Sequence, residues 1–176
     1  MKFKIFKFKN VKSTNNSAIR LIKTTSVNSG MIISENQKNG RGQYGKKWIS
    51  LKGNLFVSFF YKLDNLSVSL KQLTKINCLL VKKLISSYYK KKIIYKRPND
   101  LLIDKRKICG ILQETIKIFN KNYLIVGIGI NLKKNPKIKD YPTTNLYELI
   151  KQKVSKKKIE NEMKKIFEVK LTKLEK

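Results

Sequence analysis

Hydrophobic and polar positions alternate with a period of two at the start of the chain. Over residues 2–9, Lys alternates with Phe and Ile, which predicts a half-buried strand. Short apolar runs bounded by polar or turn-forming residues predict further strands at 30–35, 54–61, 93–95 and 122–130, and a hairpin turns near Asp104–Arg106. The chain is therefore rich in strands that are close enough in sequence to pair with one another.

A helical period appears in three places. Ser13 and Thr14 can cap a helix that AIRLIKT at 18–24 indicates. Residues 67–90 form the longest helix candidate, and the pattern after residue 144 is helical to the end. This order of elements predicts an α+β fold, a mixed and mostly antiparallel sheet with helices packed on one side of it. We expect one domain over residues 1–176, without linkers or internal repeats.

A loop rich in glycine and cations, NGRGQYGKKW, occupies residues 39–48. Gly40, Gly45 and Lys46 satisfy most of the phosphate-binding pattern G-x-x-x-x-G-K-[ST]. Lys47 stands where that pattern needs a hydroxyl, and a strand-like segment follows where it needs a helix, so a P-loop is disfavoured. The loop is either a backbone cradle for another anion or a solvated surface turn.

Three shorter motifs each have an ordinary structural interpretation and a chemical one. GIGINL at 127–132 lacks the third glycine of a dinucleotide fingerprint and favours a strand end that another group approaches closely. KRPND at 96–100 is either a turn or a site for a cation. Lys107 begins the apolar run KICGIL, where it either protects an edge strand from aggregation or serves chemistry.

Composition limits the classes of function. The net charge is +30, but only four of the 41 cations are Arg, and abundant Lys, Asn and Ile are what A/T-rich codons encode. Codon bias therefore explains the charge at least as well as nucleic-acid binding does. Cys78 and Cys109 have no metal-ligand spacing and the chain has no His, which favours two buried thiols in a reducing compartment over a zinc site or a Ser-His-Asp triad.

The start of the chain does not resemble a signal peptide. Lys residues are interspersed among the apolar residues of MKFKIFKFK, unlike in a signal peptide, and the chain has no run of about 20 apolar residues that could cross a bilayer. We expect a cytoplasmic protein without a membrane partner.

Taken together, the motifs resemble the catalytic core of the biotin protein ligases. STN at 13–15, Gln37, GRGQYGKKW, KRPNDL, KICGILQE and GIGINL occur in that family's order and approximate spacing over about residues 10–150. The resemblance implies a fold like that of class II aminoacyl-tRNA synthetases and lipoate ligases. It also implies a ligase that uses ATP and Mg²⁺ to convert biotin to biotinyl-5'-AMP, and then transfers biotin to a lysine of the biotin carboxyl carrier protein of acetyl-CoA carboxylase.

The resemblance also implies roles for individual residues. Lys107 and Arg41 would be catalytic, with Lys107 between the carboxylate and the α-phosphate. Biotin would be bound by Ser13, Thr14, Asn15, Gln37, Gly40, Arg41 and Gly110. The nucleotide would be bound by Gly42, Lys46, Lys47, Lys96, Asn99, Asp100 and Asn131. The metal ligands are not identified, and the resemblance allows a homodimer.

The chain departs from the family pattern in several places. Gln43 and Lys46 stand where Arg is common, and Arg97 replaces the usual Trp before Pro-Asn-Asp. We expect neither an amino-terminal helix-turn-helix nor a carboxy-terminal β domain. We therefore expect neither repressor activity nor specific nucleic-acid binding. The alternatives are a lipoate or octanoate ligase of the same superfamily, a basic nucleic-acid-binding module, and a degenerate ligase that binds biotin without turnover.

Overall fold

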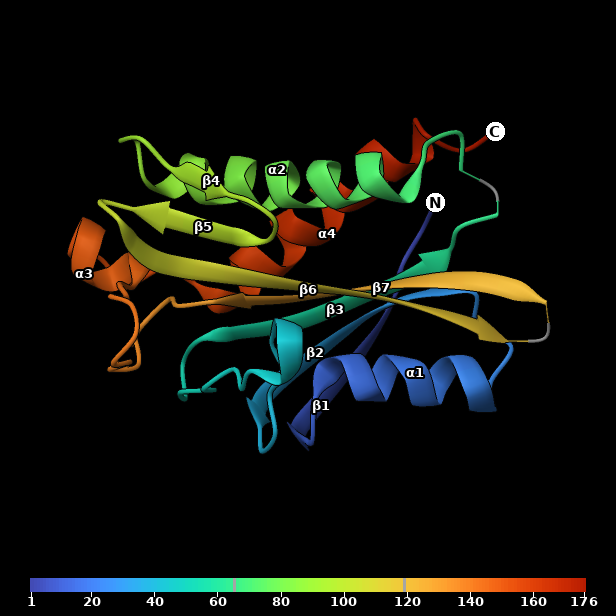
Figure 1. Ribbon diagram of the computed structural model, residues 1–176, viewed down its shortest axis with the longest axis horizontal. Coiled ribbons are helices and arrows are strands. Elements are labelled where there is room, and N and C mark those ends of the chain that lie inside the picture. Colours follow the sequence, from blue (N-terminus) through green and yellow to red (C-terminus); the bar gives the residue numbers. More distant parts are fainter. Residues whose placement is uncertain (65, 119) are drawn as a thin grey trace.

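A seven-stranded sheet forms the centre of the molecule (Figure 1). The computed structural model describes residues 1–64, 66–118 and 120–176. The strands are β1 (Lys4–Val11), β2 (Ser29–Gln37), β3 (Leu55–Lys62), β4 (Ile94–Lys96), β5 (Asp100–Ile103), β6 (Arg106–Ile118) and β7 (Lys121–Ile130). The helices are α1 (Thr14–Thr24), α2 (Leu70–Tyr88), α3 (Leu146–Ile150) and α4 (Lys156–Thr172), with a short 3₁₀ turn η1 (Gln43–Gly45). The predicted elements are present, but β1 is mostly exposed rather than half-buried, and a break at 151–155 divides the C-terminal helical segment into α3 and α4.

The sheet has the order β1-β2-β3-β7-β6-β5-β4. β1 and β2 are parallel, because α1 connects them, and every other neighbouring pair is antiparallel. The prediction of a mixed, mostly antiparallel α+β sheet is confirmed. β6 pairs with β5 on one side and β7 on the other, so the interpretation of Lys107 as an edge-strand residue is wrong.

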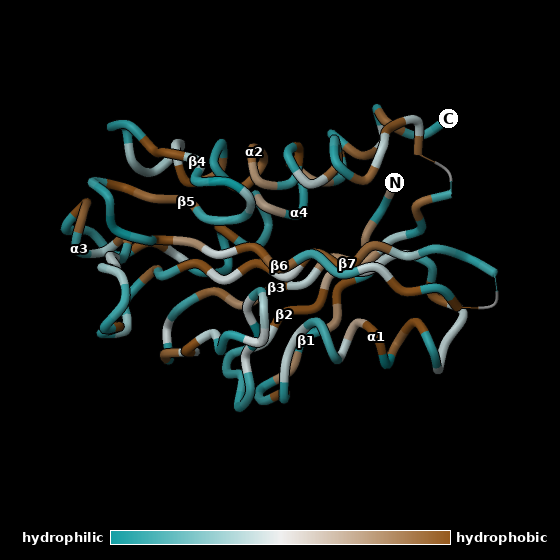
Figure 2. Tube along the Cα trace, viewed as in Figure 1, coloured by the Kyte–Doolittle hydropathy of each residue, from teal (hydrophilic) through white to brown (hydrophobic). Residues whose placement is uncertain are grey.

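Helices cover both faces of the sheet, so the expectation of helices on one side is wrong (Figure 1). α1 packs on one face through Ala18 and Ile22, against Phe60 of β3. α2 and α4 pack on the other face, where Phe167 stacks on Phe59. The reason lies in β3, where seven consecutive residues are buried, since a strand buried on both faces reads as a continuous apolar run. Hydrophobic positions concentrate in these middle strands and their helices (Figure 2).

The start of α1 differs in detail from its prediction. Ser13 lies at the N-cap position, but its side chain accepts no capping hydrogen bond from the described helix. The Thr14 backbone N–H instead donates to Gln37 Oε1 at the end of β2, over 2.8 Å. The first turn of the helix is therefore fixed by a side chain from the neighbouring strand, and its polar residues stay close to the sheet.

The two cysteines are buried and unpaired with each other, as predicted. Burial raises the pKa of Cys78 to about 11 and that of Cys109 well above its ordinary value, so both remain thiols near neutral pH. Among the described residues, no helix combines the length and apolar character needed to cross a bilayer.

Candidate active site

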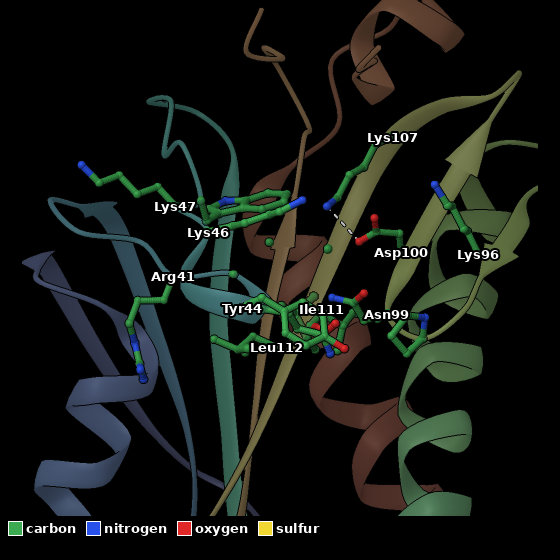
Figure 3. Close-up of a pocket in the computed structure, with 18 of the residues that line it drawn as sticks. Arg41, Tyr44, Lys46, Lys47, Lys96, Asn99, Asp100, Lys107, Ile111 and Leu112 are labelled. Carbon is green, nitrogen blue, oxygen red and sulfur yellow. Dashed lines mark hydrogen bonds and ion pairs between the residues drawn. The ribbon is translucent and has the colours of Figure 1, made fainter. Parts of the chain in front are cut away.

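A cavity of 430 Å³ opens on the α1 face, where several loops meet the ends of the central strands (Figure 3). It collects side chains from segments far apart in the sequence. The predicted site residues that line it are Ser13, Thr14, Asn15, Gln37, Arg41, Gly42, Lys46, Lys47, Lys96, Asn99, Asp100, Lys107 and Gly110. The fold therefore brings most of the motifs to one place.

One end of the cavity is polar and carries no net charge. Thr14 donates from both its backbone N–H and its hydroxyl to Gln37 Oε1, over 2.8 and 3.1 Å. Ser58 of β3 lies beneath them and is completely buried, with its Oγ 2.7 Å from Thr14 Oγ1 and 2.5 Å from Asn15 Oδ1. Gln37 Nε2 also donates to Ser50 Oγ, over 3.1 Å. These hydrogen bonds hold the amide and hydroxyl groups in fixed orientations.

Asn15 lies flat against the sheet because β7 has a glycine beneath it. A Cβ atom on Gly127 would approach Asn15 Oδ1 to 2.3 Å, so only glycine leaves room for this side chain. Asn15 Nδ2 donates to the carboxylate of Glu114 over 2.7 Å. The expectation of a strand end that another group approaches closely is met at Gly127.

The other end of the cavity surrounds Lys107. Its ammonium nitrogen lies 2.8 Å from Asp100 Oδ1, and the geometry is that of an ion pair (Figure 3). The nitrogen also lies 5.6 Å from the ring centre of Trp48 and 5.1 Å from that of Tyr141. The backbone of Lys107 bonds to Pro142 O and to Thr144 N–H, so the segment after β7 holds this residue in place.

The glycine loop folds over the sheet between these two ends. Gly42 N–H donates to Lys46 O over 2.7 Å, and Tyr44 takes a left-handed conformation with φ 54° at the tip. Trp48 then packs on β6 and β7, where a Cβ atom would come within 2.8 Å of its ring at Gly110 and 2.4 Å at Gly129. The loop is thus folded back on itself and held to the sheet by Trp48, while Tyr44 at its tip is 91% exposed.

The KRPND segment is a tight turn between β4 and β5, with a cis Arg97–Pro98 bond. Asn99 Nδ2 donates to the carbonyl of Ile111 over 3.0 Å, which ties the turn to β6. Asp100 begins β5 and faces Lys107. The turn interpretation is confirmed, and the same turn presents a carboxylate to the cavity.

Two predicted residues do not line the cavity. Gly40 is buried against the backbone of Trp48, whose carbonyl oxygen a Cβ atom would meet at 2.5 Å. Asn131 lines a separate hollow of 10 Å³ beside the cavity and donates to Thr144 O over 3.1 Å. In the structure these two residues support the loops around the cavity.

Arg41 lines the cavity but is not directed at Lys107. Its guanidinium points away from Lys107 and Asp100 (Figure 3) and pairs with Glu114, over 2.6 Å. Prediction from the sequence missed Glu114, Ser58, Trp48 and Tyr141 as parts of the site. Ser58 carried a local signal, because it interrupts the apolar run of β3, while Trp48 and Glu114 belong to the motifs GRGQYGKKW and KICGILQE.

Chemically, the cavity offers two environments next to each other. Amides and hydroxyls at one end suit a neutral ligand that both donates and accepts hydrogen bonds. At the other end Lys107, Lys46, Lys47 and Lys96 outnumber the nearby carboxylates Asp100 and Asp140, which suits phosphate or carboxylate groups. The described residues contain no cluster of three or more His, Cys, Asp or Glu that could hold a metal without help from a ligand.

The chain is similar to several known proteins. The chain is 34% identical over 102 residues to the bifunctional ligase/repressor BirA of Escherichia coli (strain K12), covering 57% of this chain and 32% of that protein. It is 28% identical over 127 residues to the biotin–[acetyl-CoA-carboxylase] ligase of Paracoccus denitrificans, covering 70% and 52%. The matched region thus spans only part of the curated relatives.

A solved structure matches almost the whole chain. The biotin protein ligase from Aquifex aeolicus in complex with biotin and ATP superimposes with a TM-score of 0.82 and 28% identity, covering 97% of this chain and 71% of that one. The model of the biotin/lipoate A/B protein ligase family matches residues 7–131. This span includes every residue that lines the cavity except Asp140, Tyr141 and Pro142, which belong to the segment that bonds to the Lys107 backbone. The chain therefore belongs to the biotin/lipoate A/B protein ligase family.

Proposed function

We propose that this protein activates biotin with ATP to form biotinyl-5'-AMP and transfers the biotinyl group to a lysine of an acceptor protein. The observation that carries the proposal is the cavity itself, in which a neutral polar end adjoins a cationic end centred on Lys107. Biotin has this division, with an uncharged ureido ring at one end and a carboxylate at the other. Relatives described as biotin ligases support the assignment.

The polar end would receive the ureido ring. The ring has two N–H donors and one carbonyl acceptor, and the side chains of Thr14, Asn15 and Gln37 offer both kinds of partner. Ser13 lines the same end, and its side chain is not used to cap α1. A lipoyl group has an apolar dithiolane ring, which can neither donate to nor accept from these polar groups, so the polar end favours biotin.

The cationic end would hold the carboxylate and the triphosphate. A carboxylate oxygen of biotin attacks the α-phosphorus, the bond from that phosphorus to the bridging oxygen breaks, and pyrophosphate leaves. Lys107 would stabilise the negative charge that grows on the α-phosphate, with Lys46, Lys47 and Lys96 adding positive charge around it. Gly42 would allow ligand atoms to approach the backbone closely, whereas at Gly110 the missing side chain makes room for the Trp48 ring.

Transfer to the acceptor needs little further chemistry. The lysine amine attacks the acyl carbon of the adenylate, the bond to the phosphate oxygen breaks, AMP leaves, and the nitrogen loses a proton. The role of the protein is to shield the mixed anhydride from water until an amine arrives. The glycine loop and Trp48, which cover the cavity, would provide that shield.

The residues present fit the Mg²⁺ ion that usually accompanies ATP. Protein sites of this kind supply one or two carboxylates and leave the remaining positions to phosphates and water. Asp100, with Asn99 beside it, would hold the ion, and Asp140 lies on the same cavity wall. The ion would neutralise phosphate charge. Whether or not the ion is bound, Asp100 would keep the Lys107 ammonium in position.

The acceptor we propose is the biotin carboxyl carrier protein of acetyl-CoA carboxylase, in the cytoplasm. The name of the Paracoccus relative specifies that carboxylase. The two free thiols fit a reducing compartment.

The test is the intact mass of a purified biotin carboxyl carrier domain after incubation with this protein, Mg²⁺-ATP and either biotin or lipoate. We expect an ATP-dependent gain of one biotinyl group and no gain with lipoate. A gain with lipoate alone would replace the proposal with a lipoate ligase. Biotin binding without any gain would identify a degenerate ligase, and no binding would contradict the proposal outright.

A further inference from the structure

Glu114 lies outside the lining of the cavity, yet one of its oxygens contacts two residues that line it. Its Oε2 accepts a hydrogen bond from Asn15 Nδ2 over 2.7 Å and from Arg41 Nη2 over 2.6 Å. Asn15 belongs to the polar end and Arg41 to the glycine loop. A single carboxylate therefore joins the polar end of the cavity to the glycine loop.

The contact with Glu114 determines which way the Asn15 amide faces. A carboxylate only accepts hydrogen bonds, so the NH₂ group of Asn15 must face Glu114 and its carbonyl oxygen must face the other way, toward Ser58. Asn15 Nδ2 also lies 3.4 Å from the carbonyl of Leu112, a second acceptor on the same strand. Asn15 is 2% exposed, so it has no water to exchange for these partners.

Arg41 supplies the countercharge to this carboxylate. Its guanidinium nitrogen lies 2.6 Å from Glu114 Oε2, and its side chain points away from the cationic end around Lys107 (Figure 3). The Arg41 backbone bridges that of Lys47, so the ion pair also fastens the glycine loop to β6. To bind an anionic group of a ligand, Arg41 would have to give up this pair.

We propose that Glu114 is a positioning residue that links Arg41 to Asn15, so that Arg41 supports binding of the neutral ring of the ligand rather than of its anionic groups. Arg41 holds the carboxylate in place, the carboxylate fixes the Asn15 amide, and the amide oxygen fixes Ser58, which also contacts Thr14 at the polar end where the ring would bind. This inference rests on the proposed function, because the ring is taken to be the ureido ring of biotin. It assigns Arg41 a different role from direct contact with carboxylate or phosphate.

Binding measurements with biotin and biotin amide distinguish support of ring binding from direct contact with the carboxylate, because the amide keeps the ring but lacks the carboxylate charge. We expect Arg41→Ala to weaken the binding of both compounds by a similar factor of about ten, the value of one lost hydrogen bond to a charged group. Isothermal titration calorimetry gives both affinities. If Arg41→Ala weakens biotin and leaves biotin amide unchanged, Arg41 binds the carboxylate and the inference is overturned.

A double-mutant cycle tests whether Arg41 acts through Glu114. Glu114→Gln keeps an acceptor for Asn15 but removes the charge that attracts Arg41. In this background we expect Arg41→Ala to cause little further loss of affinity for either compound, because the coupling has already been removed. Additive losses would show that Arg41 acts independently and would overturn the inference. Lys7→Ala, which removes the exposed cation of the Lys7–Glu160 pair, is the control and should change neither affinity.

A ligand-independent measurement keeps the inference testable if the proposed function fails. In ¹⁵N NMR spectra without added ligand, the side-chain NH₂ signals of Asn15 report its hydrogen bond to Glu114. We expect them to shift in Arg41→Ala and in Glu114→Gln, and not in Lys7→Ala. If the wild-type protein binds neither compound, the biotin assignment is wrong, and these signals alone decide the coupling. Unchanged Asn15 signals in both variants would overturn it.

Discussion

At the scale of single residues, the surroundings of Lys107 explain why one ammonium group can serve a charged transition state. Asp100 lies 2.8 Å from it, and two aromatic rings limit where it can move. A charge that is already positioned needs no reorganisation when negative charge develops nearby, and such groups contribute most to catalysis. An exposed lysine on a flexible stem would have to be ordered at that moment.

Lys107→Ala should therefore abolish chemistry while sparing ligand binding. We expect biotin affinity within a few-fold of the wild-type value and a rate of biotinyl-5'-AMP formation lower by about a hundredfold or more, as for the loss of other transition-state donors. The rate is measured in single-turnover assays with radiolabelled ATP. Lys117→Ala, at the exposed far end of the same strand, is the control. Adenylation at the wild-type rate in Lys107→Ala would refute the role given to Lys107.

The sequence allowed Lys107 and Asp100 to be predicted because each belongs to a motif with a recognisable order. Ser58 could not be predicted in the same way, because it is a lone polar residue in β3. Glu114 ends the KICGILQE motif, but its contact with Asn15, like that of Ser58, forms only when α1 packs on the sheet. Gly40 and Asn131 show the opposite case, since they belong to the motifs but lie behind the cavity wall.

At the scale of elements, β7 makes room for the site by carrying glycines on its α1 face. Gly127→Ala would place a methyl group 2.3 Å from Asn15 Oδ1, so Asn15 must move. We expect biotin affinity to fall by more than tenfold, with a loss of about 1–3 kcal/mol in the free energy of unfolding from overpacking. Calorimetric titration and urea unfolding measure the two effects.

Another position on β7 gives the matched control. Ile130 packs in the core on the α2 and α4 side of the sheet and does not line the cavity, so Ile130→Val should cost about 0.5–1.5 kcal/mol of stability and leave biotin affinity unchanged. If Gly127→Ala binds biotin as tightly as the wild type, Asn15 has no part in recognition and the ring is bound elsewhere.

α2 offers a second test at this scale, because it packs on the face opposite α1. Ser69 caps this helix, accepting from Gln72 N–H in a capping box. Ser69→Ala should reduce the free energy of unfolding by about 1 kcal/mol and leave biotin affinity unchanged, which urea unfolding and calorimetry can check. Ser26→Ala, at an exposed loop position, should change neither quantity. A loss of affinity in Ser69→Ala would mean that α2 communicates with the cavity.

The elements were easier to predict than their layers. Periods of two and 3.6 residues depend on local burial, and they located most strands and helices. Whether helices cover one face or two depends on where the chain goes after each strand, and the unbroken apolar run of β3 was the local sign that both faces are covered. The parallel pairing of β1 with β2 follows from the path of α1 and has no local signal.

At the scale of the whole molecule, charge is the dominant feature. The chain has 41 Lys and Arg against 11 Asp and Glu, so most cations have no carboxylate to pair with. Folding brings these like charges closer together, and their repulsion opposes the compact state. Dissolved salt screens such repulsion over a distance that falls from about 30 Å at 0.01 M to about 10 Å at 0.1 M ionic strength.

The free energy of unfolding should therefore rise with salt. We expect the urea midpoint to increase between about 10 and 300 mM NaCl with an unchanged m-value, which indicates that stability rather than compactness has changed. An anion bound at the cationic end of the cavity would produce a similar rise. Lys107→Ala distinguishes the causes, because overall repulsion predicts the same slope in the variant, whereas a site at Lys107 predicts a smaller one. A urea midpoint that stays constant or falls would show that repulsion between the excess lysines does not lower the free energy of unfolding.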